Sequence, residues 1–341
     1  MTGNIAHIRK PRDPHAGAIG SDIFIGRFDR WRSCVVTADS ERRRRHTRHH
    51  SALLLIAMAA LLSYCGWIIA DWDGILLSLV GGAMMLVLVR RVPPGLVLRA
   101  IGARPVARWE APVLYEIIDA LCRRAGLDRA PHLCWVGERF PVAFTIGGGE
   151  ATTIALSEEL VRGMTAREMR GILAHEIVHV RNGDIALMQL AMVVWQLTRT
   201  VSQIAFLLVF FSLFLRTVSA PSFPIVPLLV LAFAPLGVGL LQLALSRTRE
   251  GEADLEAAEL AGDPHGLASA LVKLRRQEQM LLRGRFPTAA PLRVPSLFRD
   301  HPATEERIQA LLAMPQPRGA EAPDDDLMDH PYQSQALRPW G

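Results

Sequence analysis

The chain has 341 residues, half of them hydrophobic, and a formal net charge of +5. Because only 6% of the residues are aromatic, the composition does not fit one uniformly packed globule and suggests membrane spans joined to soluble segments. The four cysteines, Cys34, Cys65, Cys122 and Cys134, lack C-x-x-C spacing and give no support for a disulfide framework, so we expect the soluble part in a reducing compartment.

Residues 1–50 form a polar, arginine-rich arm that ends in four consecutive arginines at residues 42–45. The arm has no apolar stretch as long as that of a signal peptide, so we expect no signal peptide at the N-terminus. A basic arm can bind nucleic acid, but this one stands directly before an apolar run, which favours a membrane topology signal. We therefore predict a cytoplasmic arm and no nucleic-acid partner.

Two apolar runs follow the arm and predict a transmembrane hairpin over residues 51–92. Residues 52–70 would be about 28 Å long as a helix, close to the thickness of a bilayer core. Residues 75–89 come after a short acidic turn, and arginines flank the hairpin on one side only. Since positive charge gathers on the cytoplasmic side, both ends of the hairpin should face the cytoplasm.

Two later apolar stretches, within residues 185–245, complete a predicted set of about four transmembrane helices. Arg199 lies near the middle of the first stretch, and because a charge in lipid is costly we expect it to face protein or water. Lys10 and Lys273 are the only lysines, a bias that suggests a GC-rich bacterial genome. The sequence thus predicts a multi-pass protein of a bacterial inner membrane, with the lipid bilayer as a partner.

The soluble segments predict helices around a small sheet. Apolar spacing predicts a helix at residues 111–125, and Thr165 and Glu168 form a capping-box pattern where another helix should begin. The strand candidates are residues 133–136, 142–146 and 152–156. Further helices are expected at residues 249–262, 264–282 and 304–314, and the Pro-rich residues 315–341 are expected to be disordered. The predicted fold class is mostly α with a small β-sheet.

The helix predicted to begin at Thr165 carries the segment His175-Glu176-Ile177-Val178-His179. Histidines four residues apart lie one turn apart on one face of a helix, where two imidazoles can bind one zinc ion. Glu176 can then act as general base on the zinc-bound water, as amide hydrolysis requires. Two histidines that merely pack inside a helix are the alternative, and the capped, amphipathic helix favours the zinc site.

A catalytic zinc site needs a third protein ligand, and an acidic cluster after the last apolar stretch offers candidates. On a helix Glu250 and Asp254 share a face, whereas Glu252 points about 200° away from Glu250. One carboxylate could bind zinc while its neighbour orients a ligand histidine. On spacing alone, a charge cluster beside the membrane explains these residues equally well.

Three separated segments carry a family resemblance: HEIVHVRNGD at residues 175–184, SRTREGEAD at residues 246–254 and HPATEER at residues 301–307. In these segments, and over roughly residues 105–314, the chain resembles the HtpX-like membrane metallopeptidases, which are gluzincins related to the CAAX prenyl proteases. The resemblance implies one zinc metallopeptidase domain in two parts, residues 93–184 and 246–314, with two membrane segments between them.

The resemblance also implies roles for single residues. It selects Glu250 as the third ligand of one zinc ion per chain. Asp184 matches an aspartate beside the metal site or at the helix end, and His301 matches a histidine that would stabilise the oxyanion of the tetrahedral intermediate. Arg307 matches an arginine that would hydrogen-bond to substrate or to the protein itself.

One segment departs from the family pattern. Relatives carry Asn-Ala-aromatic on the strand beside the cleft, whose edge pairs with an extended peptide substrate. This chain has Val142-Ala143-Phe144 at that place, so backbone pairing would have to act without the asparagine side chain.

These observations favour a zinc-dependent endopeptidase that cleaves membrane or membrane-proximal proteins on the cytoplasmic side, with protein or peptide as substrate. A catalytically silent, zinc-containing membrane scaffold is the alternative. Glu176 argues against the scaffold, because a structural zinc site needs no general base. A membrane-tethered nucleic-acid binder is disfavoured because the arm lacks interleaved aromatic residues and any recognisable binding module.

Overall fold

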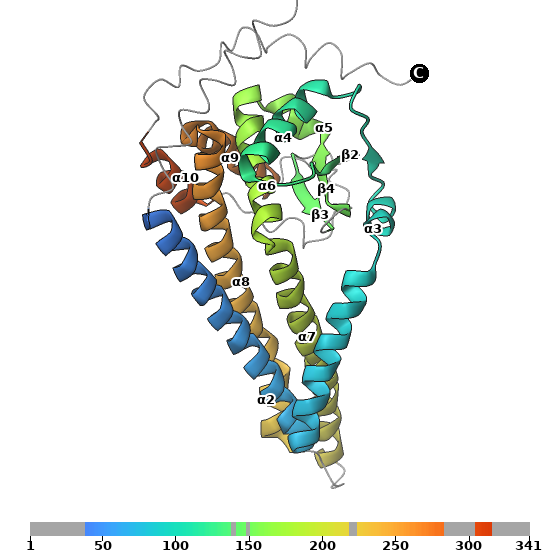
Figure 1. Cartoon of the computed structure of the whole chain (residues 1–341). Helices are drawn as coiled ribbons and strands as arrows, with labels where there is room; N and C mark the ends of the chain where they lie inside the picture. Colours follow the sequence, from blue (N-terminus) through green and yellow to red (C-terminus); the bar gives the residue numbers. More distant parts are fainter. Residues whose placement is uncertain (1–37, 138–140, 148–150, 218–223, 283–303, 316–341) are drawn as a thin grey trace, which may run out of the picture. The chain divides into compact units, whose positions relative to one another are not determined.

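A computed structural model describes residues 38–137, 141–147, 151–217, 224–282 and 304–315. The chain divides into two compact units, Met1–His49 and His50–Gly341, and the second holds the sheet and the long apolar helices. Most described residues are helical, and one four-stranded sheet accompanies them (Figure 1), which confirms the predicted fold class. Most of the predicted arm, the predicted tail from residue 316 and His301 lie outside the described residues.

Within the described residues, three helices are long and apolar enough to cross a membrane: α2 (Ala38–Arg91), α7 (Asp184–Thr217) and α8 (Ile225–Ala261). The backbone of α2 leaves helical geometry at Ala70 and Asp71, where Asp71 has a φ of 49°, so its apolar part is a hairpin of two arms. Gly66 and Gly74 meet across this turn, and a Cβ on Gly74 would overlap the carbonyl oxygen of Gly66. Glycine is therefore required where the two arms approach.

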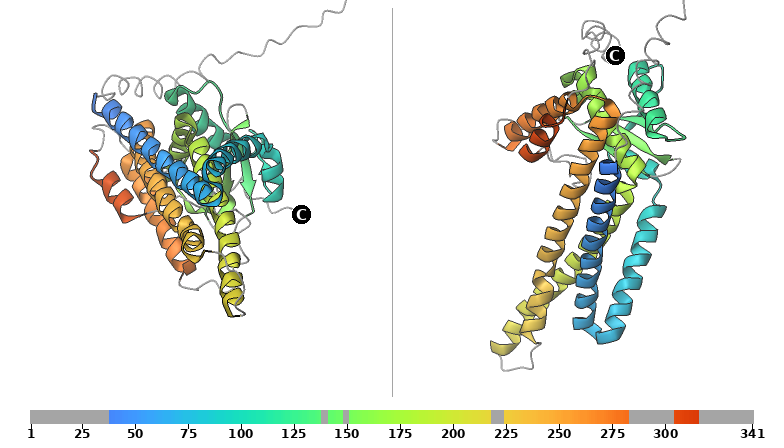
Figure 2. Two further views of the ribbon diagram at one scale, coloured as in Figure 1. Left: turned by 90° about the horizontal axis from the view of Figure 1, so that it is seen from below. Right: turned by 60° about the vertical axis from the view of Figure 1, so that its left-hand side comes forward.

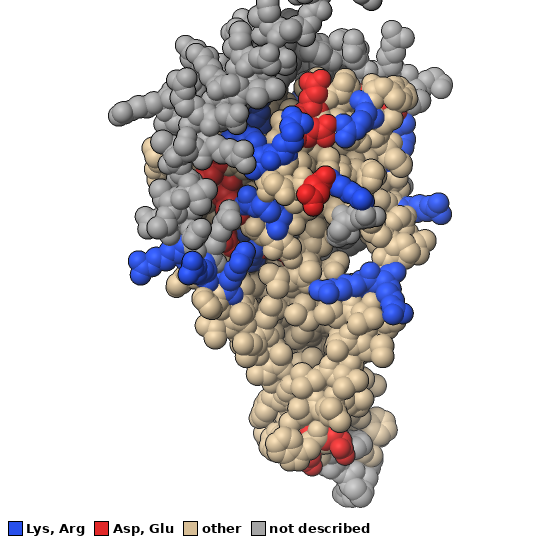
Figure 3. Space-filling view, viewed as in Figure 1, with Lys and Arg blue, Asp and Glu red and all other residues tan. Residues whose placement is uncertain are grey.

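The first arm of the α2 hairpin packs on α7 and α8, which run side by side (Figure 2). Met58 and Leu62 lie in one buried cluster with residues of both helices, and Cys65 lies in a second one. Large apolar side chains cover the outer surface of the long helices, where Figure 3 shows few charged groups between the hairpin turn and the arginines near α3. Such an apolar surface fits a lipid environment.

The sheet has the strand order β1-β2-β4-β3. β1 (Arg104–Pro105) runs antiparallel to β2 (His132–Val136), and β2 runs parallel to β4 (Thr153–Ser157). β3 (Ala143–Ile146) is antiparallel to β4 and forms an edge of the sheet. All three predicted strands are present within one residue of their expected limits, and β1 is an additional short strand.

One hydrophobic core lies among the helices α4 (Pro112–Ala125), α5 (Glu158–Gly163), α6 (Ala166–Asn182), α9 (Pro264–Leu282) and α10 (Glu305–Leu312). Buried residues from α4, α6, α9 and α10 meet the end of α8 and one face of the sheet in this core. The short helix α3 (Pro94–Ala100) packs on a separate, smaller cluster that contains Phe144 and Ile146. The close contact of α6 with α9 depends on Gly171, since a Cβ there would lie 2.9 Å from the Cα of Leu267.

Two predicted helix starts differ in how they agree with the structure. The capping box at Thr165 is present, with the Thr165 amide donating to Glu168 at 2.8 Å, so α6 begins where the sequence predicted. The separate helix predicted at residues 249–262 is wrong in its start, because α8 continues without a break from the last apolar stretch. No helix breaker stands between residues 245 and 249, so the helix of the span simply extends into the soluble part.

Candidate metal centre

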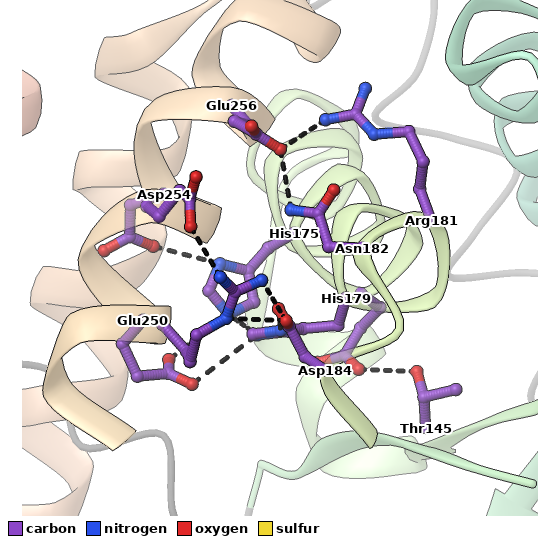
Figure 4. A network of polar contacts seen from close by, with 12 residues as sticks. Thr145, His175, His179, Arg181, Asn182, Asp184, Glu250, Asp254 and Glu256 are labelled. Carbon is purple, nitrogen blue, oxygen red and sulfur yellow. Dashed lines mark hydrogen bonds and ion pairs between the residues drawn. The ribbon is translucent and has the colours of Figure 1, made fainter. Parts of the chain in front are cut away.

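α6 and α8 bring His175, His179 and Glu250 together, and we name these three residues the donor cluster. They are 5%, 5% and 4% exposed, and Figure 4 shows the two imidazoles of α6 facing the carboxylate of α8. Histidines one helical turn apart share a face of α6. Because α8 packs against that face, Glu250 of α8 lies opposite the two imidazoles.

The distances within the donor cluster fit a zinc ion. The Nε2 atoms of His175 and His179 are 3.0 Å apart, and the Glu250 carboxylate oxygens lie 3.4 Å from the first and 3.5 Å from the second. Tetrahedral zinc with bonds of about 2.0–2.1 Å separates its ligand atoms by about 3.3 Å. The donor types, two imidazoles and one carboxylate, are also those of catalytic zinc sites.

His179 is held by a buried chain of polar contacts. Its Nδ1 atom lies 2.8 Å from Oδ2 of Asp184, the first residue of α7. Arg249 of α8 donates from Nε to Oδ1 of Asp184 at 2.7 Å and from a second nitrogen to the same oxygen. A carboxylate on Nδ1 leaves Nε2 as the atom that can bind a metal.

His175 has a parallel arrangement on the other side. Its Nδ1 atom lies 3.0 Å from Oδ1 of Asp254, and Arg307 of α10 donates to both oxygens of Asp254 at 2.5 and 2.7 Å. Arg307 also lies 3.1 Å from Oε2 of Glu250. Of the two roles that the resemblance left open for Arg307, the structure shows contacts with the protein itself.

The electrostatics of this region favour a cation. Burial disfavours the charged imidazolium of His179, but the hydrogen bonds to Asp184 and Glu250 outweigh it and raise the pKa of His179 to about 10. Burial acts in the same way on His175, and hydrogen bonds to Asp254 and Glu250 raise its pKa. The buried charged residues around the histidines are the acidic Glu176, Asp184, Glu250 and Asp254 and the basic Arg249 and Arg307. When both histidines are neutral, as metal ligands must be, the four carboxylates and two guanidinium groups among the described residues leave two negative charges in excess, which a divalent metal ion would neutralise.

Glu176 lies beside the donor cluster and has one partner that the sequence did not reveal. The hydroxyl of Thr145 on β3 donates to Oε2 of Glu176 at 2.7 Å. Side chains alternate along a strand, and Phe144 and Ile146 point into the cluster beneath α3, so Thr145 faces α6. That alternation was the only signal for Thr145 in the sequence.

The strand with the family departure lies at the edge of the sheet, beside α6. Val142 precedes β3, and its side chain packs with the apolar cluster of Phe144. Its backbone is fixed by Ser157, since the Val142 amide donates to Oγ and the Ser157 amide donates to the Val142 carbonyl, each at 2.9 Å. The backbone at Val142 is therefore held in place by Ser157, without an asparagine.

A cavity of about 540 Å³ opens beside Glu250. It reaches from Glu250 along the apolar parts of α7 and α8, with α10 on its other side. Its other lining residues are Met188, Gly239, Gln242, Leu243, Ser246, Arg247, Gly251, Thr304, Glu306, Arg307 and Ala310.

The fold brings four of the predicted site residues to one place. His175, Glu176, His179 and Glu250 lie together, whereas Glu252 turns away and pairs with Arg249 at 2.8 Å. Their roles as ligands and base stay predictions, and His301 lies outside the described residues. Arg249 was missed, because a contact between residues 65 positions apart leaves no mark in local spacing.

Comparison with known proteins adds a family. The model of peptidase family M48 matches residues 108–315. A protease HtpX homolog of Methylibium petroleiphilum is 32% identical over 273 residues, which cover 76% of this chain and 95% of the relative. The protease HtpX homolog of Paraburkholderia phytofirmans is 34% identical over 277 residues, covering 76% of this chain and 94% of the relative. No solved structure was found to match the chain.

Proposed function

The chain belongs to peptidase family M48, and from this premise we propose that it is a zinc endopeptidase of the inner membrane whose active site faces the cytoplasm. Its family makes it a metalloprotease, which acts on protein or peptide substrates. Its long apolar helices make it a membrane-associated one. The proposed substrates are membrane or membrane-proximal proteins, cut within the chain.

The spacing of the donor cluster is the observation that carries the proposal. His175, His179 and Glu250 would hold the zinc ion, with separations of 3.0–3.5 Å between their ligand atoms. Bound zinc lowers the pKa of a water molecule and polarises a substrate carbonyl. With both histidines neutral, the excess of two negative charges around them matches the charge of a divalent ion.

Glu176 is the proposed general base. It would take a proton from the attacking water and deliver it to the nitrogen of the departing amine, so the peptide bond breaks with its protons balanced. The Thr145 hydroxyl donates to one carboxylate oxygen of Glu176 at 2.7 Å and would orient the other toward the attacking water. Glu176 is only 3% exposed, and burying a carboxylate costs free energy. A catalytic role would explain why this cost is tolerated beside the two histidines.

The edge strand β3 is the proposed peptide-binding element. An extended substrate can add to the outer edge of β3 through main-chain hydrogen bonds, which need no particular side chain. This mode explains how the chain can bind substrate with Val142 in place of an asparagine. His301 remains the proposed partner of the oxyanion.

Charge distribution supports the cytoplasmic side for the active site. Arg90 and Arg91 end the α2 hairpin, and Arg247 and Arg249 lie where α8 leaves its apolar stretch. All four stand at the end of the hairpin or span that leads to the soluble part, whereas acidic residues occupy the opposite turn, at positions 71 and 73. Positive charge marks the cytoplasmic ends of membrane helices.

The test compares the wild type with Glu176→Gln, both purified in detergent and supplied with zinc. The wild type should cleave casein and cut itself, while the variant should lose roughly 10²–10⁴-fold of the rate, the usual contribution of a general base. Both proteins should bind one zinc ion per chain by elemental analysis, because Glu176 is not among the proposed ligands.

Equal inactivity of both proteins with zinc bound would reject the peptidase and favour the silent zinc scaffold. Self-cleavage products of the wild type, identified by mass spectrometry, serve as a second readout that does not depend on casein as a substrate.

A further inference from the structure

A stripe of polar side chains runs along the outside of α7. Gln196, Arg199 and Gln203 are all exposed, and spacings of three and four residues place them on one face of the helix. Within the described part of the chain, Arg199 forms no ion pair, and its guanidinium group lies 5.2 Å from the ring centre of Trp195. We name Gln196, Arg199 and Gln203 the α7 stripe.

The α7 stripe lies near the middle of the membrane. A Cβ on Gly82 would lie 3.7 Å from Leu62 and 3.8 Å from Leu197. Leu62 and Gly82 stand near the centres of the two apolar runs of the α2 hairpin, residues 52–70 and 75–89. Residue 197 of α7 is therefore level with both centres, and Arg199 lies about 3 Å further along the helix.

Lipid is a poor surrounding for this stripe. Half of a bilayer core is about 15 Å, more than an arginine side chain can span to reach the headgroups. Charged residues at such depth usually face a partner or a polar cavity. Among the residues that the structure describes, no acidic partner meets Arg199, so we look for its partner in another molecule.

Met188 and Trp195 connect the face of α7 that carries Arg199 with the cavity beside Glu250. Met188 lines that cavity, and Met188, Trp195 and Arg199 follow one another at spacings of seven and four residues on one face of α7. Gly239 of α8 also lines the cavity, and a Cβ there would lie 3.7 Å from Nε1 of Trp195. One face of α7 thus leads from the bilayer centre to Glu250.

Charge complementarity limits which molecule can be the partner of Arg199. A second copy of the chain packed through the same face would place Arg199 against Arg199, since a two-fold contact uses the same patch twice. The apolar runs of this chain also offer no acid, because residues 52–70, 75–89, 185–217 and 225–245 contain no Asp or Glu. The partner is therefore a different protein with its own intramembrane acid.

We propose that the α7 stripe binds the transmembrane helix of the substrate, and that it selects helices with an Asp or Glu near their midpoint. Arg199 pairs with that acid, and Gln196 and Gln203 hydrogen-bond on either side of it. A helix held in this way directs the adjoining cytoplasmic segment into the cavity beside Glu250. This inference rests on the proposed function and names its substrate class.

The experiment uses two single-span model proteins in vesicles of phosphatidylethanolamine and phosphatidylglycerol. They share one cytoplasmic segment and a polyleucine helix, and they differ only in a central Asp or Leu. The wild type should cleave the Asp helix roughly tenfold faster, as expected for one polar contact between membrane helices. Arg199→Leu should remove this preference, and Arg199→Glu should restore it for a helix with a central Arg. Arg216→Leu, at the end of α7, is the matched control and should keep the wild-type preference.

Crosslinking separates the two proposals. In the Glu176→Gln background, a photoreactive Asp helix should crosslink to α7 several-fold more than the Leu helix. Casein cleavage without any preference between the helices, in either assay, would overturn the docking of substrate on the α7 stripe. Preferred crosslinking of the Asp helix, together with a wild type that cleaves neither casein nor the model proteins, would support the docking surface and reject the peptidase.

Discussion

Glu250 and Glu252 stand two residues apart on α8 and meet different surroundings. Glu250 faces both histidines, whereas Glu252 accepts a hydrogen bond from Arg249 at 2.8 Å. Glu250→Ala should therefore lose zinc, since two imidazoles alone hold the ion weakly. Glu252→Ala should keep about one zinc per chain, measured by elemental analysis after gel filtration.

The pair of variants controls for folding as well as for charge, because each removes one carboxylate from the same turn of α8. Loss of zinc from Glu252→Ala together with retention in Glu250→Ala would overturn the assignment of the third ligand.

Thr145 offers a second test at the scale of one residue. Thr145→Val keeps the shape of the side chain and removes the hydrogen bond to Glu176, so the proposed base should lose its orientation. A hydrogen bond to a charged group contributes about 1.5–3 kcal/mol, so kcat should fall roughly 10- to 100-fold with little change in KM. Thr145→Ser should recover most of the rate, and zinc content should stay unchanged in both. A Thr145→Val enzyme with full kcat would show that Glu176 needs no such support.

At the scale of the element, the start of α6 depends on Glu168. This carboxylate accepts hydrogen bonds from the Thr165 amide, Ser269 Oγ and Lys273 Nζ, so it ties α6 to α9. Burial alone would raise its pKa, but the bonds from Lys273, Ser269 and Thr165 outweigh burial and lower the pKa of Glu168. The helix that carries His175 is thus fixed at its N-terminus by an ionised group.

Glu168→Gln should lower the free energy of unfolding by about 1–3 kcal/mol, because the charge-assisted bond to Lys273 is lost. A lowered folded-state pKa means that the wild type holds this stability above the ordinary pKa of a glutamate and loses it as the pH falls through the lowered value. Thermal unfolding in detergent across acidic pH measures both effects. Glu159→Gln, an exposed change on α5, is the control and should leave unfolding unchanged.

Local sequence signals predicted the elements that have such signals. The capping box at Thr165 and the apolar period of α4 are read within one or two turns, so the start of α6 and both limits of α4 were predicted to within one residue. β1 has two residues and owes its form to pairing with β2, which no local pattern encodes. The continuity of α8 was missed for a similar reason: a change from apolar to charged residues marks the water boundary and leaves the helix intact.

In the candidate site, too, local patterns were predictable from the sequence and long-range contacts were not. His175, Glu176 and His179 were predicted as site residues from their spacing on a single helix. The phase of another helix made Glu250 a candidate ligand, which the family resemblance then selected. Which helices would meet, and that Thr145 and Arg249 would complete the network, depends on long-range packing. Spacing in the sequence carries no information about those contacts.

At the scale of the whole molecule, the proposed topology predicts which surfaces are reachable from outside the cell. Asp73 is exposed at the hairpin turn and Glu159 is exposed on α5 of the soluble part. In a Cys34→Ser background, an impermeant maleimide should label Asp73→Cys in intact spheroplasts and Glu159→Cys only after lysis. The native cysteines at residues 65, 122 and 134 are buried and should stay unlabelled. Labelling in the opposite order would place the active site outside.

Gly183 is the only residue between α6 and α7, and its left-handed backbone, with a φ of 71°, turns one helix directly into the other. The helix with both histidines is therefore joined to a candidate membrane helix by a single residue, with no flexible loop between them. Asp184, where α7 begins, follows His179 by five positions. At helical rise this separation is about 7 Å, or roughly two residues of extended substrate. We expect this protein to cut a polypeptide close to the point where it leaves the bilayer. The distance of the peptide bond from the lipid surface would determine the cleavage site more than the neighbouring side chains of the substrate.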